Sequence, residues 1–372
     1  MKVNHEDMRR LMLLHINKGE SLMVRGEPGI GKTEGVEDMA AYMAKKLDKK
    51  LVVWSKLSQQ DKSEFYFKKE LRETSYFLSL IDLLAKLPED LGGLPRSRED
   101  FMEWIPDLQF WVLSQPEVHG LAFFDELLQA QQAVQKPVAN MFLRGMLGTL
   151  KVSDNVAVVG ASNRKQDKCG VIDMLEHLKN RMGHVELGVP TADQWVKWAW
   201  DNNIDERLIS FTMFKPELLF QKLEDRKQDA YPTPRSIAIT SNLVKDQVDS
   251  DDREFLEAVV ASRVGDAYAA AFTSFIELRD QIDCQGCLDN PKRVEGLTLD
   301  HKIAFTSWAV ENVKKKGHLE KTLRVAEYLG REDLSLMMLS MVKNKIEKPQ
   351  LKAVLEKPEF EWMYQRLYKY LK

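Results

Sequence analysis

The sequence predicts an α/β fold in which a mainly parallel sheet lies between helices and is followed by an all-helical part. Short apolar runs typical of buried strands alternate with helical stretches through the first half of the chain. A glycine-rich loop directly follows the first of these runs and leads into a helix. From about Thr191 onward, strand-like runs almost vanish and apolar residues recur at helical spacing.

The composition is that of a globular protein. The chain has 372 residues, 44% of them hydrophobic and 30% charged, and at roughly one domain per 150 residues it forms two to three domains. No run approaches the roughly 20 apolar residues that a membrane-spanning helix needs. The first residues soon include acidic ones and have no apolar core of the kind found in a secretory signal peptide, which argues against secretion. We therefore expect a cytoplasmic location and no membrane partner. The net charge of −3 disfavours a non-specific nucleic-acid coat.

The strands and helices follow in a regular order. Apolar residues spaced by three and four predict a helix over 5–16, with Asn4 as its N-cap and Gly19 after its end. Residues 21–25 form the first strand-like run, and helical periodicity resumes after the glycine loop. Further strand-like runs lie at 51–54, 121–124, 156–159 and 184–187.

The glycine loop fits the pattern G-x-x-x-x-G-K-[ST] at every fixed position. Its backbone N–H groups and the following helix N-terminus suit a triphosphate. Lys32 would bridge the β- and γ-phosphates, and the Thr33 hydroxyl would bind Mg²⁺. The sequence therefore predicts ATP and Mg²⁺ as cofactors, with the nucleotide held by Gly26, Glu27, Pro28, Gly29, Ile30, Gly31, Lys32 and Thr33.

Polar residues end two later strand-like runs. Asp125 and Glu126 follow the run at 121–124, so that Asp125 would hold Mg²⁺ and Glu126 would polarise the attacking water. Asn163 follows the run at 156–159 and could hold the same water from the other side. By itself, Asn163 also fits an ordinary turn at the end of a strand.

Two arginines are candidates for neutralising charge on the γ-phosphate. Arg181 lies just before the run at 184–187, where one subunit of a ring would present it to its neighbour. Arg235 opens a helix in the helical part and could reach the nucleotide of its own subunit. Such an arginine contributes about 10³ to 10⁵ in turnover. A surface salt bridge is the alternative for each.

Cysteines and tryptophans each leave two interpretations open. Cys284 and Cys287 have the spacing of half a zinc site or a redox pair, but also of two reduced thiols at a helix end, which we favour. Trp195, Trp198 and Trp200 could form a stacking platform for nucleic acid, although a helix with its rings packed inward is the simpler interpretation.

With these motifs in this order, the chain resembles the AAA+ ATPases and, within them, the MoxR-like branch. Residues 26–33, 123–126, 161–164, 178–182 and 232–236 occur where that branch has its Walker A, Walker B, sensor 1, arginine-finger and sensor 2 motifs. Residues 57–61 and 90–95 resemble segments around the helix 2 insert, and 143–152 the pre-sensor hairpin. The resemblance implies an AAA+ P-loop core over 1–190, a helical lid over 191–249 and a helical extension over 250–372. Residues 62–89 depart from the pattern and are expected to be a largely helical insertion.

What the resemblance implies for function is a ring, a hexamer in the family, whose central loops engage a protein client, often beside a partner with a von Willebrand factor A domain. The first hypothesis is therefore an ATP hydrolase that remodels a protein client. A nucleic-acid motor, driven by ATP or GTP, is the alternative, although the nearly neutral charge disfavours it. A nucleotide switch with little turnover is a third, against which Glu126 and Asn163 speak.

Overall fold

The computed structural model describes residues 2–167, 169–172, 174, 176–245 and 252–363. Two compact units form the chain, Met1–Val189 and Pro190–Lys372. The expected boundary between 249 and 250 lies outside the described residues, so the three-domain division stays a prediction.

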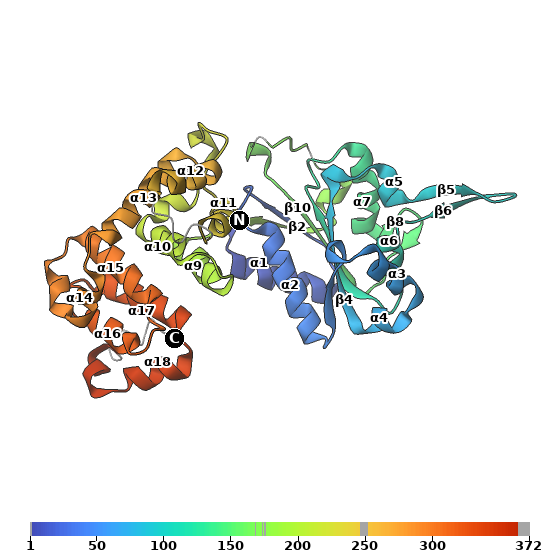
Figure 1. The fold of residues 1–372 in the computed structure, drawn as a ribbon. Helices are drawn as coiled ribbons and strands as arrows, with labels where there is room; N and C mark the ends of the chain where they lie inside the picture. Colours follow the sequence, from blue (N-terminus) through green and yellow to red (C-terminus); the bar gives the residue numbers. More distant parts are fainter. Residues whose placement is uncertain (1, 168, 173, 175, 246–251, 364–372) are drawn as a thin grey trace. The chain divides into compact units, whose positions relative to one another are not determined.

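The first unit is built around a seven-stranded parallel sheet (Figure 1). This confirms the predicted α/β class. The spatial order is β1-β11-β2-β10-β7-β4-β3, so β10 lies between the strand before the glycine loop and the strand that ends in the acidic pair. The strands are β1 (Lys2–Val3), β2 (Leu22–Gly26), β3 (Lys50–Val53), β4 (Ser75–Asp82), β7 (His119–Asp125), β10 (Val156–Ser162) and β11 (Gly183–Leu187).

Helices cover both faces of this sheet (Figure 1). One face carries α1 (His5–Lys18) and α2 (Lys32–Lys46). The N-cap of α1 is confirmed, because the Asn4 Oδ1 atom accepts a hydrogen bond of 2.8 Å from the Asp7 N–H. The remaining helices of the unit are α3 (Gln59–Phe67), α4 (Lys69–Thr74), α5 (Pro88–Gly92), α6 (Leu108–Leu113), α7 (Gln132–Arg144) and α8 (Glu176–Lys179).

The segment 62–89, expected to be a largely helical insertion, holds helices up to Thr74 but then contributes a strand to the sheet. That segment contains β4, which pairs in parallel with β3 on one side and with β7 on the other. Tyr76, Phe77 and Leu78 are all buried there. A strand buried on both faces shows a continuous apolar run rather than alternation, and periodicity alone does not separate such a run from a buried helix.

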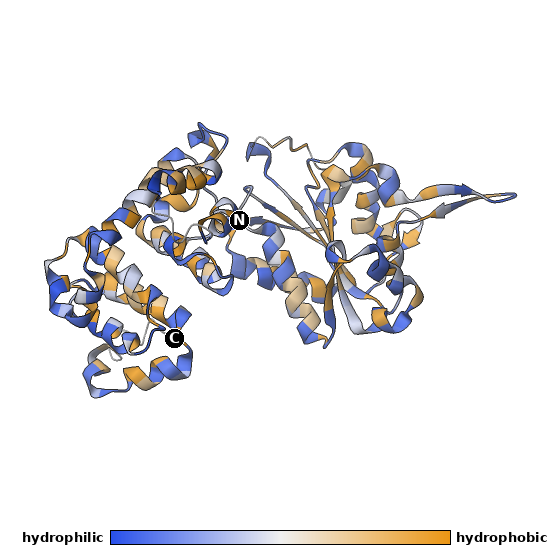
Figure 2. Cartoon of the chain, in the orientation of Figure 1, coloured by the Kyte–Doolittle hydropathy of each residue, from blue (hydrophilic) through white to orange (hydrophobic). Residues whose placement is uncertain are grey.

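Two hairpins leave this unit. The first, β5 (Leu94–Ser97) with β6 (Met102–Ile105), projects away from the sheet (Figure 1). Colouring by hydropathy shows apolar residues along it (Figure 2), and its exposed large apolar side chains are Leu94, Phe101, Met102, Trp104 and Ile105. The second is short, β8 (Met146–Leu147) with β9 (Leu150–Lys151), and falls within the segment compared above with a pre-sensor hairpin.

The second unit is helical in its described part. One continuous hydrophobic core runs through it from Trp195 to Met363. Trp195 is buried in that core, with Trp198 and Trp200 packed against it, which confirms the inward-facing interpretation. The helices are α9 (Ala192–Asp201), α10 (Glu206–Phe214), α11 (Pro234–Lys245), α12 (Arg253–Val264), α13 (Asp266–Asp280), α14 (Cys284–Asp289), α15 (Leu299–Glu311), α16 (His318–Val325), α17 (Glu332–Lys345) and α18 (Lys348–Leu355).

Ion pairs in which at least one side chain is largely buried join helices that are far apart in this unit's sequence. Arg279 on α13 makes two hydrogen bonds of 2.8 Å to the Glu311 carboxylate on α15. Lys345 on α17 contacts Glu206 on α10 and donates to the Glu311 carbonyl at 2.6 Å. Charges taken out of water require such partners, so the pairs fix how these helices meet.

The two helix cysteines are buried free thiols. Cys284 begins α14 and Cys287 lies one turn later. Burial raises the pKa of the Cys284 thiol to about 12 and also raises the pKa of Cys287. Because the thiolate is the form that attacks disulfides and binds metals, a raised pKa disfavours both kinds of chemistry here.

We therefore expect Cys284 and Cys287 to react more slowly than the half-buried Cys169 with an alkylating reagent at pH 8. The rate follows the thiolate fraction, which falls about tenfold for each unit by which the pKa exceeds the pH. Peptide mapping by mass spectrometry after timed labelling measures the three rates. In denaturant the rates should converge, whereas rapid labelling of either helix cysteine in the native protein would contradict the prediction.

Candidate nucleotide site

The glycine loop connects β2 to α2 as predicted. Gly29 and Gly31 have φ angles of 77° and 92°, values that residues with a side chain rarely adopt. Gly26 has little free space, since a Cβ atom there would lie 2.8 Å from the Ile30 side chain and 3.0 Å from the Leu187 carbonyl oxygen. The three glycines therefore allow the tight path by which the chain leaves the strand.

Lys32 lies at the centre of the candidate site. Its side-chain Nζ donates to the carbonyl oxygens of Gly26 at 2.9 Å and Glu27 at 3.0 Å, and to the Asn163 Oδ1 atom at 2.7 Å. The residue is only 7% exposed. A buried ammonium needs such acceptors in place of water. These contacts join the loop to the end of β10.

Thr33 and Asp125 are also brought together. The Thr33 hydroxyl donates to the Asp125 Oδ2 atom at 2.9 Å. Asp125 ends β7, and its other oxygen accepts from the Glu126 N–H at 2.9 Å. The hydroxyl and carboxylate predicted to share Mg²⁺ are thus direct neighbours, although they lie 92 positions apart in the sequence.

Glu126 has a left-handed backbone, with φ of 56°. For a residue with a side chain, this conformation costs about 1–3 kcal/mol, and such strain is concentrated at functional sites. The Glu126 Oε2 atom accepts from the Asn163 Nδ2 group at 3.4 Å and also contacts the Gln129 amide. Asn163 therefore lies between Lys32 and Glu126 and contacts both.

Three contacting residues were missed by sequence reasoning. Gln129 contacts Glu126 and accepts from the Ser162 hydroxyl at 2.7 Å. His5 lies against the loop, with its Nε2 atom 2.7 Å from the Ile30 carbonyl oxygen. Arg164 forms an ion pair with Glu27 at 2.9 Å. For Gln129 and Arg164 the only sequence signal is closeness to a motif, which does not say which way a side chain points, and His5, at the start of α1, has no such signal.

Burial and partners set the protonation of two of these groups. Burial lowers the pKa of His5, so that the neutral ring with a proton on Nε2 fits its hydrogen bond to Ile30. Burial by itself would lower the pKa of the Arg164 guanidinium, but hydrogen bonds to Asp167 and Glu186 raise it. Arg164 is therefore a fixed positive charge beside the loop.

The two arginines predicted to contact the nucleotide lie in different units of the chain. Arg181 is exposed and precedes β11 in the first unit. Arg235 is exposed in the first turn of α11 in the second unit. That helix starts as expected, since the Thr233 Oγ1 atom accepts from the Ser236 N–H at 3.0 Å. Their contacts with a nucleotide stay predictions.

The residues present fit Mg²⁺ bound with a triphosphate. The ammonium and the glycine loop provide positive charge and backbone donors for phosphates. Among the described residues no cluster of three His, Cys, Asp or Glu side chains surrounds a metal position. Mg²⁺ usually takes one or two protein oxygens and completes its shell with phosphates and water, and the Thr33 hydroxyl and the Asp125 carboxylate could supply those oxygens.

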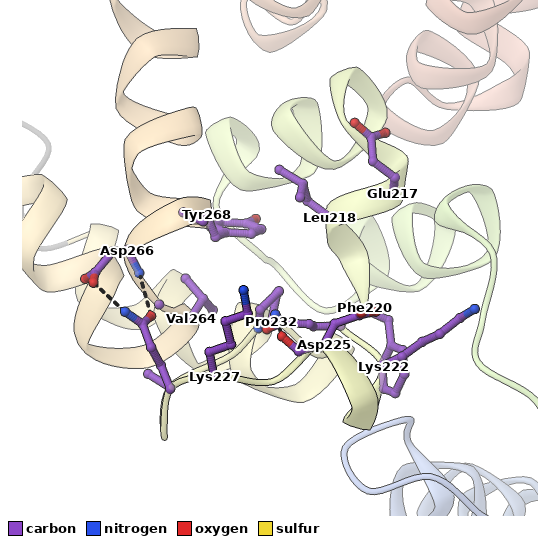
Figure 3. A pocket seen from close by; sticks show the side chains of 15 residues that line it. Glu217, Leu218, Phe220, Lys222, Asp225, Lys227, Pro232, Val264, Asp266 and Tyr268 are labelled. Atoms are coloured by element: carbon purple, nitrogen blue, oxygen red, sulfur yellow. Dashed lines mark hydrogen bonds between the residues drawn. The ribbon is translucent and has the colours of Figure 1, made fainter.

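A pocket of about 560 Å³ lies in the second unit (Figure 3). Leu218, Phe220, Val264 and Tyr268 form apolar walls, and Gln228 is hydrogen-bonded to Asp266 at its edge. None of the residues predicted to bind the nucleotide lines it. Its lining also carries both signs of charge, Lys222 and Lys227 beside Glu217, Asp225 and Asp266.

The chain has similar proteins among solved structures, at low sequence identity. No family model and no curated protein matches the sequence. Similar solved structures include a RuvB mutant from Thermotoga maritima, with 14% identity and a TM-score of 0.34 over 87% of this chain and 89% of that chain. NtrX from Brucella abortus has 13% identity and a TM-score of 0.37 over 92% and 68%. The ORC2 protein of Aeropyrum pernix, in ADPNP-ADP complexes, has 11% identity and a TM-score of 0.37 over 95% and 83%.

Proposed function

We propose that the chain is a MoxR-like AAA+ ATPase that assembles into a ring and couples ATP hydrolysis to the remodelling of a protein client. One observation carries this proposal: Lys32, Thr33, Asp125, Glu126 and Asn163 meet at the carboxyl ends of three adjacent parallel strands. That edge of a parallel sheet is where α/β proteins bind their ligands.

Each residue has a role that its contacts support. Mg²⁺ bound with the nucleotide would neutralise phosphate charge, held by Thr33 and Asp125. Lys32 would leave Asn163 to bind phosphate oxygens, so that the Asn163 amide could then orient water. Glu126 lies 3.4 Å from that amide and would polarise the water for attack on the γ-phosphate.

A neighbouring subunit would complete the site. The exposed position of Arg181 before β11 suits a guanidinium that acts on the nucleotide of the next subunit. Arg235 would act from the helical lid of the same subunit. Because the charge supplied by such an arginine contributes about 10³ to 10⁵ in turnover, hydrolysis would depend on ring assembly.

The exposed β5–β6 hairpin is the surface on which a client would bind. Five large apolar side chains are exposed on a two-stranded element that projects from the sheet. Exposed apolar groups gathered in this way are typical of interaction sites.

The proposal also includes a hexameric ring, a partner with a von Willebrand factor A domain and a cytoplasmic location, through the resemblance to the MoxR-like branch. No described helix is both long enough and apolar enough to span a bilayer.

Mixing two inactive variants tests the shared site. Arg181→Ala and Glu126→Gln subunits should each hydrolyse ATP slowly, whereas their mixture should recover partial turnover. Recovery is expected because one variant supplies the arginine and the other the glutamate. Steady-state ATPase rates across protein concentration measure this effect, with the wild type rising as rings form. An additive mixture and a flat concentration dependence would contradict the shared site.

Substitutions on the hairpin test client binding. A carboxymethylated, permanently unfolded protein should raise the ATPase rate of the wild type. In the Phe101→Ser/Trp104→Ser double variant, the ratio of stimulated to basal rate should fall towards one, because the apolar contact surface is lost. Leu84→Ser/Leu87→Ser is the matched control, since both leucines are exposed but lie outside the hairpin.

The outcomes separate the candidate functions. Equal stimulation of the hairpin variant and the control would remove the hairpin as the client surface. Salt-dependent stimulation by single- or double-stranded DNA, with none by the unfolded protein, would favour the nucleic-acid motor instead.

A further inference from the structure

Arg164 spans three strand ends at the start of the glycine loop. It follows β10, and β2 lies between β10 and β11 in the sheet. Its guanidinium forms an ion pair with Glu186 on β11 at 3.2 Å. It forms a second ion pair, at 2.9 Å, with Glu27, the first residue after β2. The side chain thus crosses over the point where the loop leaves the sheet.

The pairing of Arg164 is extensive and largely buried. Asp167 approaches the guanidinium to 2.6 Å and accepts from the Arg164 N–H at 2.9 Å. The exposed fractions of the side chains are 12% for Arg164, 16% for Glu27 and 5% for Asp167. Ion pairs of this burial are screened less by salt than surface pairs. Arg164 is therefore held in one position by Asp167 and Glu186, independently of Glu27.

Charge gives this contact a consequence for nucleotide binding. Glu27 lies within the loop that would enclose a triphosphate, and its own carbonyl oxygen accepts from Lys32. A carboxylate next to bound phosphates repels them unless a cation compensates its charge. Arg164 supplies that cation and draws the carboxylate toward β11.

We propose that Arg164 is a positioning residue for the nucleotide, which neutralises Glu27 and fixes the start of the glycine loop to the strand that carries Asn163. This inference rests on the proposed nucleotide site. Arg164 does not touch the reacting atoms in this role. It acts through Glu27, by preparing the loop before the nucleotide arrives.

A binding assay without turnover tests the proposal. In Arg164→Met, the Kd for a fluorescent ADP analogue should rise by at least about tenfold, which corresponds to about 1.4 kcal/mol. In steady-state hydrolysis, KM should rise more than kcat falls. Arg164→Lys should show a smaller rise in Kd, because it keeps the charge but lacks the planar fork that contacts several carboxylates.

A matched variant separates positioning from general stability. Arg72 and Glu117 form another buried pair in the same unit, at 2.7 Å with side-chain exposures of 9% and 13%. Arg72→Met breaks a comparable pair away from the loop. It should lower the unfolding temperature, as Arg164→Met does, but leave the Kd for the ADP analogue unchanged.

A double-mutant cycle isolates the contact between Arg164 and Glu27. Glu27→Gln combined with Arg164→Met should recover most of the lost affinity, because the uncompensated carboxylate is gone; Glu27→Gln alone completes the cycle. Additive effects, or an unchanged Kd in Arg164→Met, would overturn the positioning role. Failure of the wild type to bind the ADP analogue would instead overturn the proposed nucleotide site itself.

Discussion

The structure around the candidate site depends on one buried ammonium. Lys32 has exchanged water for two loop carbonyl oxygens and the Asn163 amide oxygen, because an unpartnered charge at this depth would be strongly unfavourable. These three contacts define the path of the loop and bring the end of β10 to it. They are also contacts that phosphate oxygens would replace, so nucleotide binding and the orientation of Asn163 are physically linked in the proposed mechanism.

Parallel strand order is what converts distant residues into neighbours. Thr33 and Asp125 are 92 positions apart, and Lys32 and Asn163 are 131 apart. Both pairs meet because the carboxyl ends of β2, β10 and β7 lie side by side at one edge of the sheet. Apolar side chains on both faces of the strands are buried in the core. The polar groups at this edge therefore lie at the ends of rigid strands.

Charge at this edge is balanced by two cations with different tasks. Asp125 and Glu126 lie at the end of β7, whereas Glu27 follows β2 and pairs with Arg164. Lys32 lies near the centre and would be available to a ligand, while Arg164 is occupied by protein carboxylates. In the proposed mechanism, the positive charge of Lys32 would serve the nucleotide, whereas that of Arg164 compensates the carboxylate of Glu27 in the loop.

The sequence alone determined the glycine loop, the helix after it, the acidic pair, Asn163, the N-cap of α1 and the change from alternating strands to helices, because these depend on local spacing and backbone preference. Only the tertiary structure decided that the segment containing Phe77 is an interior strand of the sheet, since a run buried on both faces carries no periodicity. The contacts of Gln129, His5 and Arg164 were likewise decided by which strand ends meet. Side-chain direction across a sheet edge is a long-range property, and neighbouring residues in the sequence do not encode it.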